Sequence, residues 1–143
     1  MAQSTAMPTL PGGHGSDNVR LAFRVHPGRY AVCRLSPDAP PPAWALQGDF
    51  YSLTRTHQEL SIVCTETAVP DGVRAEIDWI CLQLVGPFDF ALTGILNAFL
   101  QPLAAARVPI FALSTFDTDW VLIPAPHLAA ALQALAGAGH TVS

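Results

Sequence analysis

The sequence of 143 residues predicts an α+β fold with two ferredoxin-like units of the order βαββαβ, whose antiparallel sheets carry their helices on one face. Three observations lead to this prediction. They are stretches of strand length that alternate apolar and polar residues, longer apolar segments with helical spacing, and a match between the two halves of the chain. The expected organisation is a disordered tail at 1–18, a first domain with a short crossover helix at 19–72, and a second domain at 73–143.

The first half of the chain contains four short stretches that favour strands. VRLAFRV (19–25) and YAVCRL (30–35) stand on either side of the turn HPG, and FYSLTRT (50–56) and ELSIVC (59–64) on either side of a polar tip. Three consecutive prolines at 40–42 lie in the connection between the two pairs. Because proline cannot donate a backbone hydrogen bond inside a helix, the crossover helix must be short.

The second half has the stronger helix signal. IDWICLQLV (77–85) is expected to form a strand, and the loop GPFDF (86–90) follows it. The segment 90–107 predicts an amphipathic helix, which Pro102 should bend or weaken. The apolar residues at helical spacing are Leu92, Ile95, Leu96, Phe99, Leu100 and Leu103.

Three strands and one helix complete the second half. The strands are expected at 108–116, 120–124 and 140–142, and the helix at 126–140. Pro126 favours the start of this helix, because the first helical position has no intrahelical partner for its N–H.

The two halves match one another when the chain is compared with itself. At an offset of 60 residues, FYSLTRTHQELSIV (50–63) lies over IFALSTFDTDWVLI (110–123) without a gap. This alignment places His57 on Asp117 and Glu59 on Asp119. It predicts two equivalent hairpins, one in each unit.

Composition narrows the classes of function. Half of the residues are hydrophobic and 13% are charged, which favours a packed globule. The net charge is −4 and the seven basic residues are scattered, so we expect no nucleic acid partner. No apolar run approaches the ~20 residues that span a bilayer, and 1–18 lacks the features of a signal peptide. We expect a cytoplasmic protein without a membrane partner.

The cysteines and histidines do not form a metal-binding pattern. Cys33, Cys64 and Cys81 are odd in number, lack CxxC spacing and lie in apolar runs. We expect them to be buried and reduced, as in a cytosolic protein. None of the five histidines is spaced as a metal ligand, and each is expected at the solvated surface.

The segment STFDTDW (114–120) is the strongest candidate for chemistry. Asp117 and Asp119 would suit a divalent cation if further ligands converged on them, but no accompanying motif is present. A hairpin turn with Asp117 and Thr118 at the bend explains part of the segment. It does not explain why Asp119 opens an apolar strand, where a carboxylate could receive the cationic group of a ligand.

The loop GPFDF and the following helix start offer backbone N–H groups for a ligand carboxylate. Asp89 is better explained as the N-cap of that helix than as a direct ligand contact. Gly94 would cost about 1 kcal/mol relative to alanine inside a helix. That cost is understandable if a ligand or another backbone approaches closely.

Residues 21–142 resemble the small tandem ACT-domain proteins of the ACT-7 type. They are similar to the CASTOR-family arginine sensor and to the regulatory ACT pairs of aspartate kinases. The motifs that carry the resemblance are STFDTDWV (114–121) and LTGIL (92–96). The resemblance implies a regulatory protein that binds an amino acid or similar effector at a domain or subunit interface, through the first β–α loop and the second strand.

The leading hypothesis is a non-catalytic sensor without cofactor or metal, which forms a homo-oligomer (a dimer or higher) and acts on a protein partner of unspecified identity. Asp119 is expected to bind the cationic group of the ligand, and the backbone near 88–95 its carboxylate. The alternatives are a ligand-free oligomerisation or interaction module, and an enzyme that uses the Asp pair with a metal. The expected ligand-binding residues are Phe88, Asp89, Thr93, Gly94, Ile95, Ser114, Thr115, Phe116 and Asp119.

Overall fold

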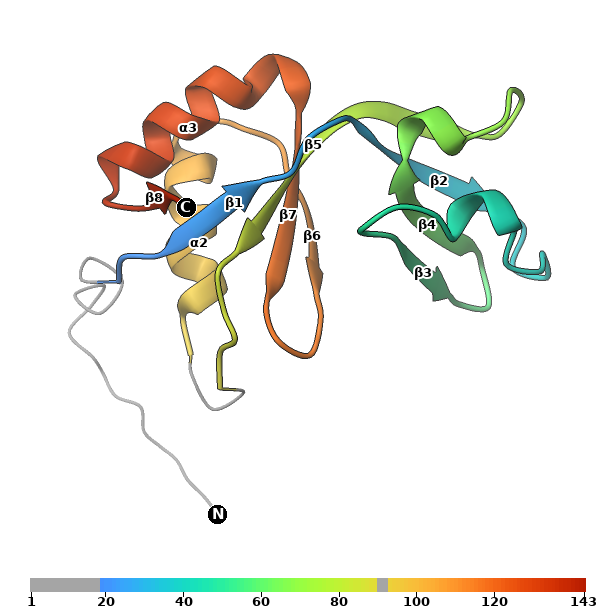
Figure 1. The fold of residues 1–143 in the computed structure, drawn as a ribbon, viewed down its shortest axis with the longest axis horizontal. Helices are drawn as coiled ribbons and strands as arrows, with labels where there is room; N and C mark the ends of the chain where they lie inside the picture. The colour runs from blue at the N-terminus through green and yellow to red at the C-terminus, as the bar shows by residue number, and fades with distance from the viewer. Residues whose placement is uncertain (1–18, 90–92) are drawn as a thin grey trace.

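Two lobes share one sheet in the computed structural model, which describes residues 19–89 and 93–143 (Figure 1). One lobe carries both α helices of these ranges, and the other consists of strands and short turns. None of the helices in these ranges is long and apolar enough to cross a membrane. The predicted α+β class with a mainly antiparallel sheet is confirmed.

The elements follow one another in the order expected for two related halves. The strands are β1 (Ala22–Val25), β2 (Tyr30–Leu35), β3 (Ser52–Arg55), β4 (Leu60–Thr65), β5 (Ala75–Leu84), β6 (Phe111–Ser114), β7 (Asp119–Pro124) and β8 (Thr141–Val142). The α helices are α2 (Ile95–Ala105) and α3 (Leu128–Gly137). Three short 3-10 helices are η1 (Ala43–Ala45), η2 (Glu66–Ala68) and η3 (Ala125–His127).

The long strand β5 joins the two lobes. Along one edge it pairs with β2 through 75–79 and with β1 through 82–84, antiparallel in both cases. Along its other edge it pairs with β7 through 79–83. Each lobe therefore uses a different part of the same strand.

The predicted HPG turn between β1 and β2 does not reverse the chain. β1 begins its pairing opposite Leu84 and ends opposite Leu82, and β2 continues in the same direction from Trp79. The four residues 26–29 thus lie opposite only two residues of β5 and form a bulge. The N–H of His26 donates to the Cys81 carbonyl over 2.9 Å and keeps this bulge on the sheet.

The bulge places β1 in the second lobe, where it lies between β5 and β8. The sequence analysis assigned 19–25 to the first domain, whereas 22–25 pair with strands of the second lobe. Residues such as Pro and Gly occur in β-bulges as well as in turns that reverse the chain. Which of the two forms depends on the strands with which the flanking segments pair. The boundary between 72 and 73 stays a prediction.

The helices differ from the prediction in extent. The short crossover helix of the first half is the single 3-10 turn η1, which directly follows Pro42. The helix predicted over 90–107 begins at Ile95, and 90–92 lies outside the described residues. The helix predicted over 126–140 is divided into η3 and α3. Only the second lobe therefore has α helices, within the part of the chain that the structure describes.

Hydrophobic clusters cover both faces of the shared sheet. On one face, α2 and α3 pack on β1, β5 and β7, with Phe23 and Phe99 in edge-to-face contact. On the opposite face, Phe50 from the first lobe stacks on Trp120 of β7, with ring centroids 4.1 Å apart. Tyr30 of β2 packs against Phe50 in turn. This second cluster fastens the lobes to one another.

All three cysteines are free and buried, as predicted. Burial raises the pKa of the Cys81 thiol to about 12, because apolar surroundings disfavour the charged thiolate. An exposed cysteine in the unfolded chain titrates near 8.5. The two values define a pH window in which the folded chain holds this proton and the unfolded chain does not.

We therefore expect the free energy of unfolding to fall as pH rises through this window, by up to about 1.4 kcal/mol per pH unit from Cys81. The thiol's contribution is complete below about pH 8.5 and is lost toward about pH 12. Urea unfolding at a series of pH values measures the slope. The Cys81→Ala variant should have a shallower slope, and an identical slope in both proteins would refute the assignment.

Candidate ligand-binding site

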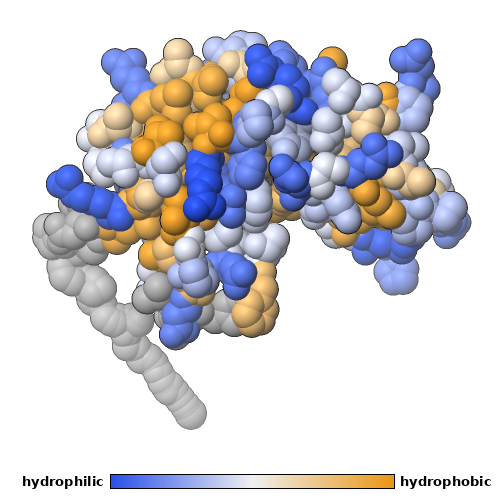
Figure 2. Space-filling model, viewed as in Figure 1, coloured by the Kyte–Doolittle hydropathy of each residue, from blue (hydrophilic) through white to orange (hydrophobic). Residues whose placement is uncertain are grey.

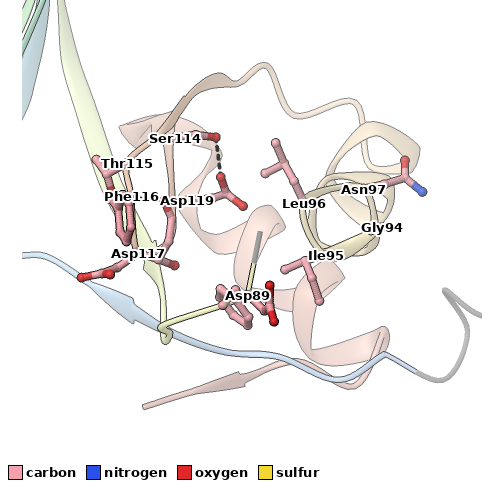
Figure 3. Close-up of a pocket in the computed structure, with 12 residues that line it drawn as sticks. Asp89, Gly94, Ile95, Leu96, Asn97, Ser114, Thr115, Phe116, Asp117 and Asp119 are labelled. Carbon is pink, nitrogen blue, oxygen red and sulfur yellow. Dashed lines mark hydrogen bonds between the residues drawn. The ribbon is translucent and has the colours of Figure 1, made fainter. Parts of the chain in front are cut away.

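A cavity of about 330 Å³ lies between the hairpin β6–β7, the β5–α2 loop and the start of α2 (Figure 3). Eight of the nine residues predicted for ligand binding line it. The exception is Thr93, which is exposed and lies outside the lining. The eight are Phe88, Asp89, Gly94, Ile95, Ser114, Thr115, Phe116 and Asp119, and four further lining residues are Leu96, Asn97, Asp117 and Thr118.

Asp119 reaches the cavity because of strand alternation. It is the first residue of β7, and Val121, on the same face of the strand, packs in the core beneath the helices. Ser114 is its cross-strand partner, and the Ser114 hydroxyl donates to Asp119 Oδ1 over 2.5 Å. Figure 3 shows the half-buried Asp119 side chain in the space between the hairpin and α2. The carboxylate is thus held in place and aimed at the cavity.

Thr115 and Trp120 close the hairpin. The Thr115 N–H and hydroxyl both donate to the Thr118 carbonyl, over 2.9 and 3.1 Å. The indole N–H of Trp120 donates to the Thr115 hydroxyl over 3.2 Å. The Thr115 side chain is therefore occupied by the hairpin itself and contributes to the cavity as part of its wall.

Asp117 and Thr118 fasten the hairpin to the β5–α2 loop, a role that the turn pattern did not predict. The Phe88 N–H donates to the Asp117 carbonyl over 2.9 Å, and the buried Thr118 hydroxyl donates to the Leu84 carbonyl over 2.8 Å. Gly86 lies at the same junction, where a Cβ atom would stand 2.8 Å from the Asp117 carbonyl oxygen. The only available signal in the sequence was a glycine before a proline in the loop.

The start of α2 corrects two expectations. Gly94, not Asp89, is the N-cap residue. Gly94 has φ of 78°, and a Cβ atom there would meet nothing within 4 Å. The left-handed backbone explains this glycine, and a close approach does not. The first intrahelical bond runs from the Ala98 N–H to the Gly94 carbonyl, so the N–H groups of 95–97 lie at the positive end of the helix.

The cavity is rich in negative charge. Three of its lining residues are aspartates (Asp89, Asp117 and Asp119), and no lysine, arginine or histidine is among the described residues that line it. The positive pole of the site comes from the first turn of α2. Opposite poles of this kind suit a ligand that carries both a cationic group and a carboxylate. Among the described residues, no group of three or more histidine, cysteine or acidic side chains is arranged to hold a metal ion.

The first lobe has no equivalent of this site. The Thr56 N–H donates to the Glu59 carbonyl as the Thr115 N–H donates to the Thr118 carbonyl, so the hairpins correspond at an offset of 59 residues. The offset of 60 was wrong by one. Leu60, which is 1% exposed, occupies the position of Asp119. The carboxylate at this position is thus confined to the second hairpin.

Family models match both halves of the chain. A model described as an ACT domain matches residues 74–137, and a model described as an N-terminal domain matches residues 28–72. The human protein CASTOR3P is 30% identical over 87 residues, which cover 52% of this chain and 53% of that protein. The chain therefore spans about half the length of this curated relative.

Solved structures extend the similarity over nearly the whole chain. Protein Atu0741 from Agrobacterium tumefaciens is 40% identical, with a TM-score of 0.83 over 87% of this chain and 93% of that chain. The ligand-free regulatory subunit of aspartate kinase from Thermus thermophilus is 17% identical, with a TM-score of 0.58 over 81% of this chain and 96% of that one. At this lower identity the second similarity concerns the fold alone.

Proposed function

Because residues 74–137 match the model of the ACT domain, we propose that the chain is a non-catalytic cytoplasmic sensor that binds an amino acid or a similar small effector. The observation that carries this proposal is the cavity with two opposite poles. The Asp119 carboxylate lies on one side, and the first turn of α2 lies on the other. No cofactor is required for this function.

The ligand would lie between these poles. Its cationic group would meet Asp119, whose Oδ1 is already held by Ser114, and its carboxylate would accept hydrogen bonds from the N–H groups of 95–97. Phe88 packs against the core with one side and lines the cavity with the other, so it would contact the ligand side chain. Three aspartates in the lining favour amino acids with neutral or cationic side chains over acidic ones.

Regulation would follow from differential affinity. A ligand that binds one association state better than another shifts the equilibrium toward it, and no catalytic group is needed. The relatives from Thermus thermophilus and Thermus flavus are regulatory subunits of aspartate kinase. By analogy, we infer a homo-oligomer whose ligand-bound state acts on a partner protein.

A screen of the twenty amino acids by thermal unfolding tests the proposal. A ligand present at about 100 times its Kd should raise the free energy of unfolding by roughly 2.7 kcal/mol. Asp119→Asn should remove most of this stabilisation, because it removes the charge and leaves an oxygen for the Ser114 hydroxyl. The effect of glutamate and aspartate should be the smallest.

Asp71→Asn is the matched control, because it makes the same charge change on an exposed loop of the first lobe. It should respond to the ligand as the natural protein does. Equal stabilisation of the Asp119→Asn variant and the natural protein would place the ligand elsewhere.

The alternative function is a ligand-free interaction module, which two observations favour. Phe116, at the tip of the second hairpin, is 78% exposed. The outer surface of α3 carries no charged residue between Leu128 and Gly137, and Figure 2 shows hydrophobic residues gathered over it. Failure of every amino acid to stabilise the protein, together with a concentration-dependent oligomer, would favour this function.

A further inference from the structure

We propose a second ligand-binding site on the first lobe, for a small zwitterion that carries a carboxylate and an ammonium group. It is a cavity of about 480 Å³ on the open face of β2, β3 and β4, at the junction with β6. It shares no residue with the cavity around Asp119. The proposal is therefore independent of the proposed sensor function.

Polar and cationic side chains form a row across this face. Strand pairing places Thr54 opposite Ser61, and Ser61 opposite Arg34. Arg74 continues the row, because its carbonyl accepts the Arg34 N–H over 2.9 Å. Two hydroxyls and two guanidinium groups thus line the same side of the cavity, which is the donor set that a carboxylate prefers.

The neighbouring row supplies an apolar surface and a negative charge. Val32 pairs with Glu76 across β2 and β5. Phe111 of β6, in the second lobe, lines one side of the cavity. Glu59, in the turn between β3 and β4, also lines it. A ligand could therefore place its carboxylate on the arginine row, its apolar part on Val32 and Phe111, and its ammonium group near Glu76.

The four charged side chains that line this cavity are Arg34, Arg74, Glu59 and Glu76, and they form no ion pair with one another. Among the described residues, the one salt bridge joins Arg29 to Asp78, outside this cavity. Arg34 donates to the Gln58 carbonyl over 2.8 Å. No hydrogen bond or ion pair is formed by the side chains of Arg74, Glu59 and Glu76 in the part of the chain that the structure describes. Two charges of each sign around one cavity are complementary to a zwitterion, whereas a simple anion or cation would meet like charges.

The size of the cavity favours a ligand longer than one amino acid. Its volume of about 480 Å³ exceeds the 330 Å³ of the cavity around Asp119. Glu76 stands one row beyond the arginines, beside the apolar side chain of Val32. A dipeptide can place its carboxylate on one row and its ammonium group on the next, with its short apolar body against Val32.

The probe is the dipeptide Ala-Ala, with N-acetylalanine and alanine amide as analogues that carry a single charge. Two-dimensional NMR of the full chain at millimolar ligand reports binding through the amide signals of Arg34, Ser61 and Glu76. We expect Ala-Ala to shift these signals until they saturate. Each analogue should bind at least about tenfold more weakly than Ala-Ala, because one of its two charges is missing.

Variants separate this site from the first one. Arg74→Gln and Glu76→Gln should each weaken Ala-Ala binding about tenfold. Arg24→Gln, at an exposed position on β1 outside the cavity, should leave it unchanged. Asp119→Asn should also leave it unchanged, so failure of the proposed sensor function and failure of this proposal are distinguishable.

Three outcomes would overturn the proposal. The amide signals of the first lobe could stay in place at saturating Ala-Ala, or move equally with N-acetylalanine and sodium chloride. The third outcome is unchanged binding in the Arg74→Gln and Glu76→Gln variants. Each would mean that the four charges are ordinary solvated side chains.

Discussion

The Gly86→Ala variant should lose about 2–3 kcal/mol of stability and bind ligand poorly in the Asp119 cavity. A Cβ atom at this position would stand 2.8 Å from the Asp117 carbonyl oxygen and 3.2 Å from both the Phe88 nitrogen and Thr118 Cβ. Two of these neighbours are backbone atoms, and they are joined by the hydrogen bond that holds the hairpin to the loop. The added methyl group must therefore push the two walls of the cavity apart.

Urea unfolding measures this loss, and Gly137→Ala is its matched control. Gly137 is the last residue of α3, and a Cβ atom there would meet nothing within 4 Å. Because alanine favours a helix over glycine, the control should be neutral or stabilised by up to about 1 kcal/mol. If Gly86→Ala were as stable as the natural protein, the junction between hairpin and loop would not be as tight as described.

The His140→Ala variant should lose about 3 kcal/mol, although the sequence analysis placed this histidine at the surface. His140 is 3% exposed. Its Nδ1 accepts the Leu21 N–H over 3.0 Å, and its Nε2 donates to the Ala98 carbonyl over 3.1 Å. Pro102 explains the second bond, because it lacks the N–H that would otherwise bind the carbonyl four residues earlier. Alanine would leave both backbone groups buried without a partner.

His57→Ala is the control for this change, since His57 is exposed in the turn between β3 and β4. It should alter the free energy of unfolding by less than about 0.5 kcal/mol. Hydrogen exchange gives a second readout, because the amide of Leu21 should exchange faster in His140→Ala. Unchanged exchange at Leu21 would contradict the assigned hydrogen bond.

Local patterns predicted the parts of the fold that depend on neighbouring residues. Alternation in YAVCRL and WVLIP placed β2 and β7 on the correct segments. Eight of the nine residues chosen from the resemblance and from the position of Asp119 line one cavity. The strand predictions succeeded because strand spacing acts over a few residues, and the role of the eight residues in ligand binding stays a prediction.

Several other expectations failed where a distant segment decides the outcome. The HPG segment is a bulge because β1 and β2 both pair with β5. His140 is buried, where it binds the Ala98 carbonyl that Pro102 leaves without its helical partner. The offset between the hairpins is 59 because hydrogen bonds, and not residue similarity, define the turn.

The sequence by itself determined the α+β class, the strands, the second hairpin and the acidic residue at its base, since each depends on local periodicity. Only the tertiary structure decided that β1 joins the second lobe and that the turn residues Asp117 and Thr118 hold the cavity together. It also decided that Leu60 replaces the carboxylate in the first hairpin. The physical reason is that strand partners, register and buried hydrogen bonds depend on how the whole chain packs and on whether every buried polar group finds a partner. Neighbouring residues alone do not determine them.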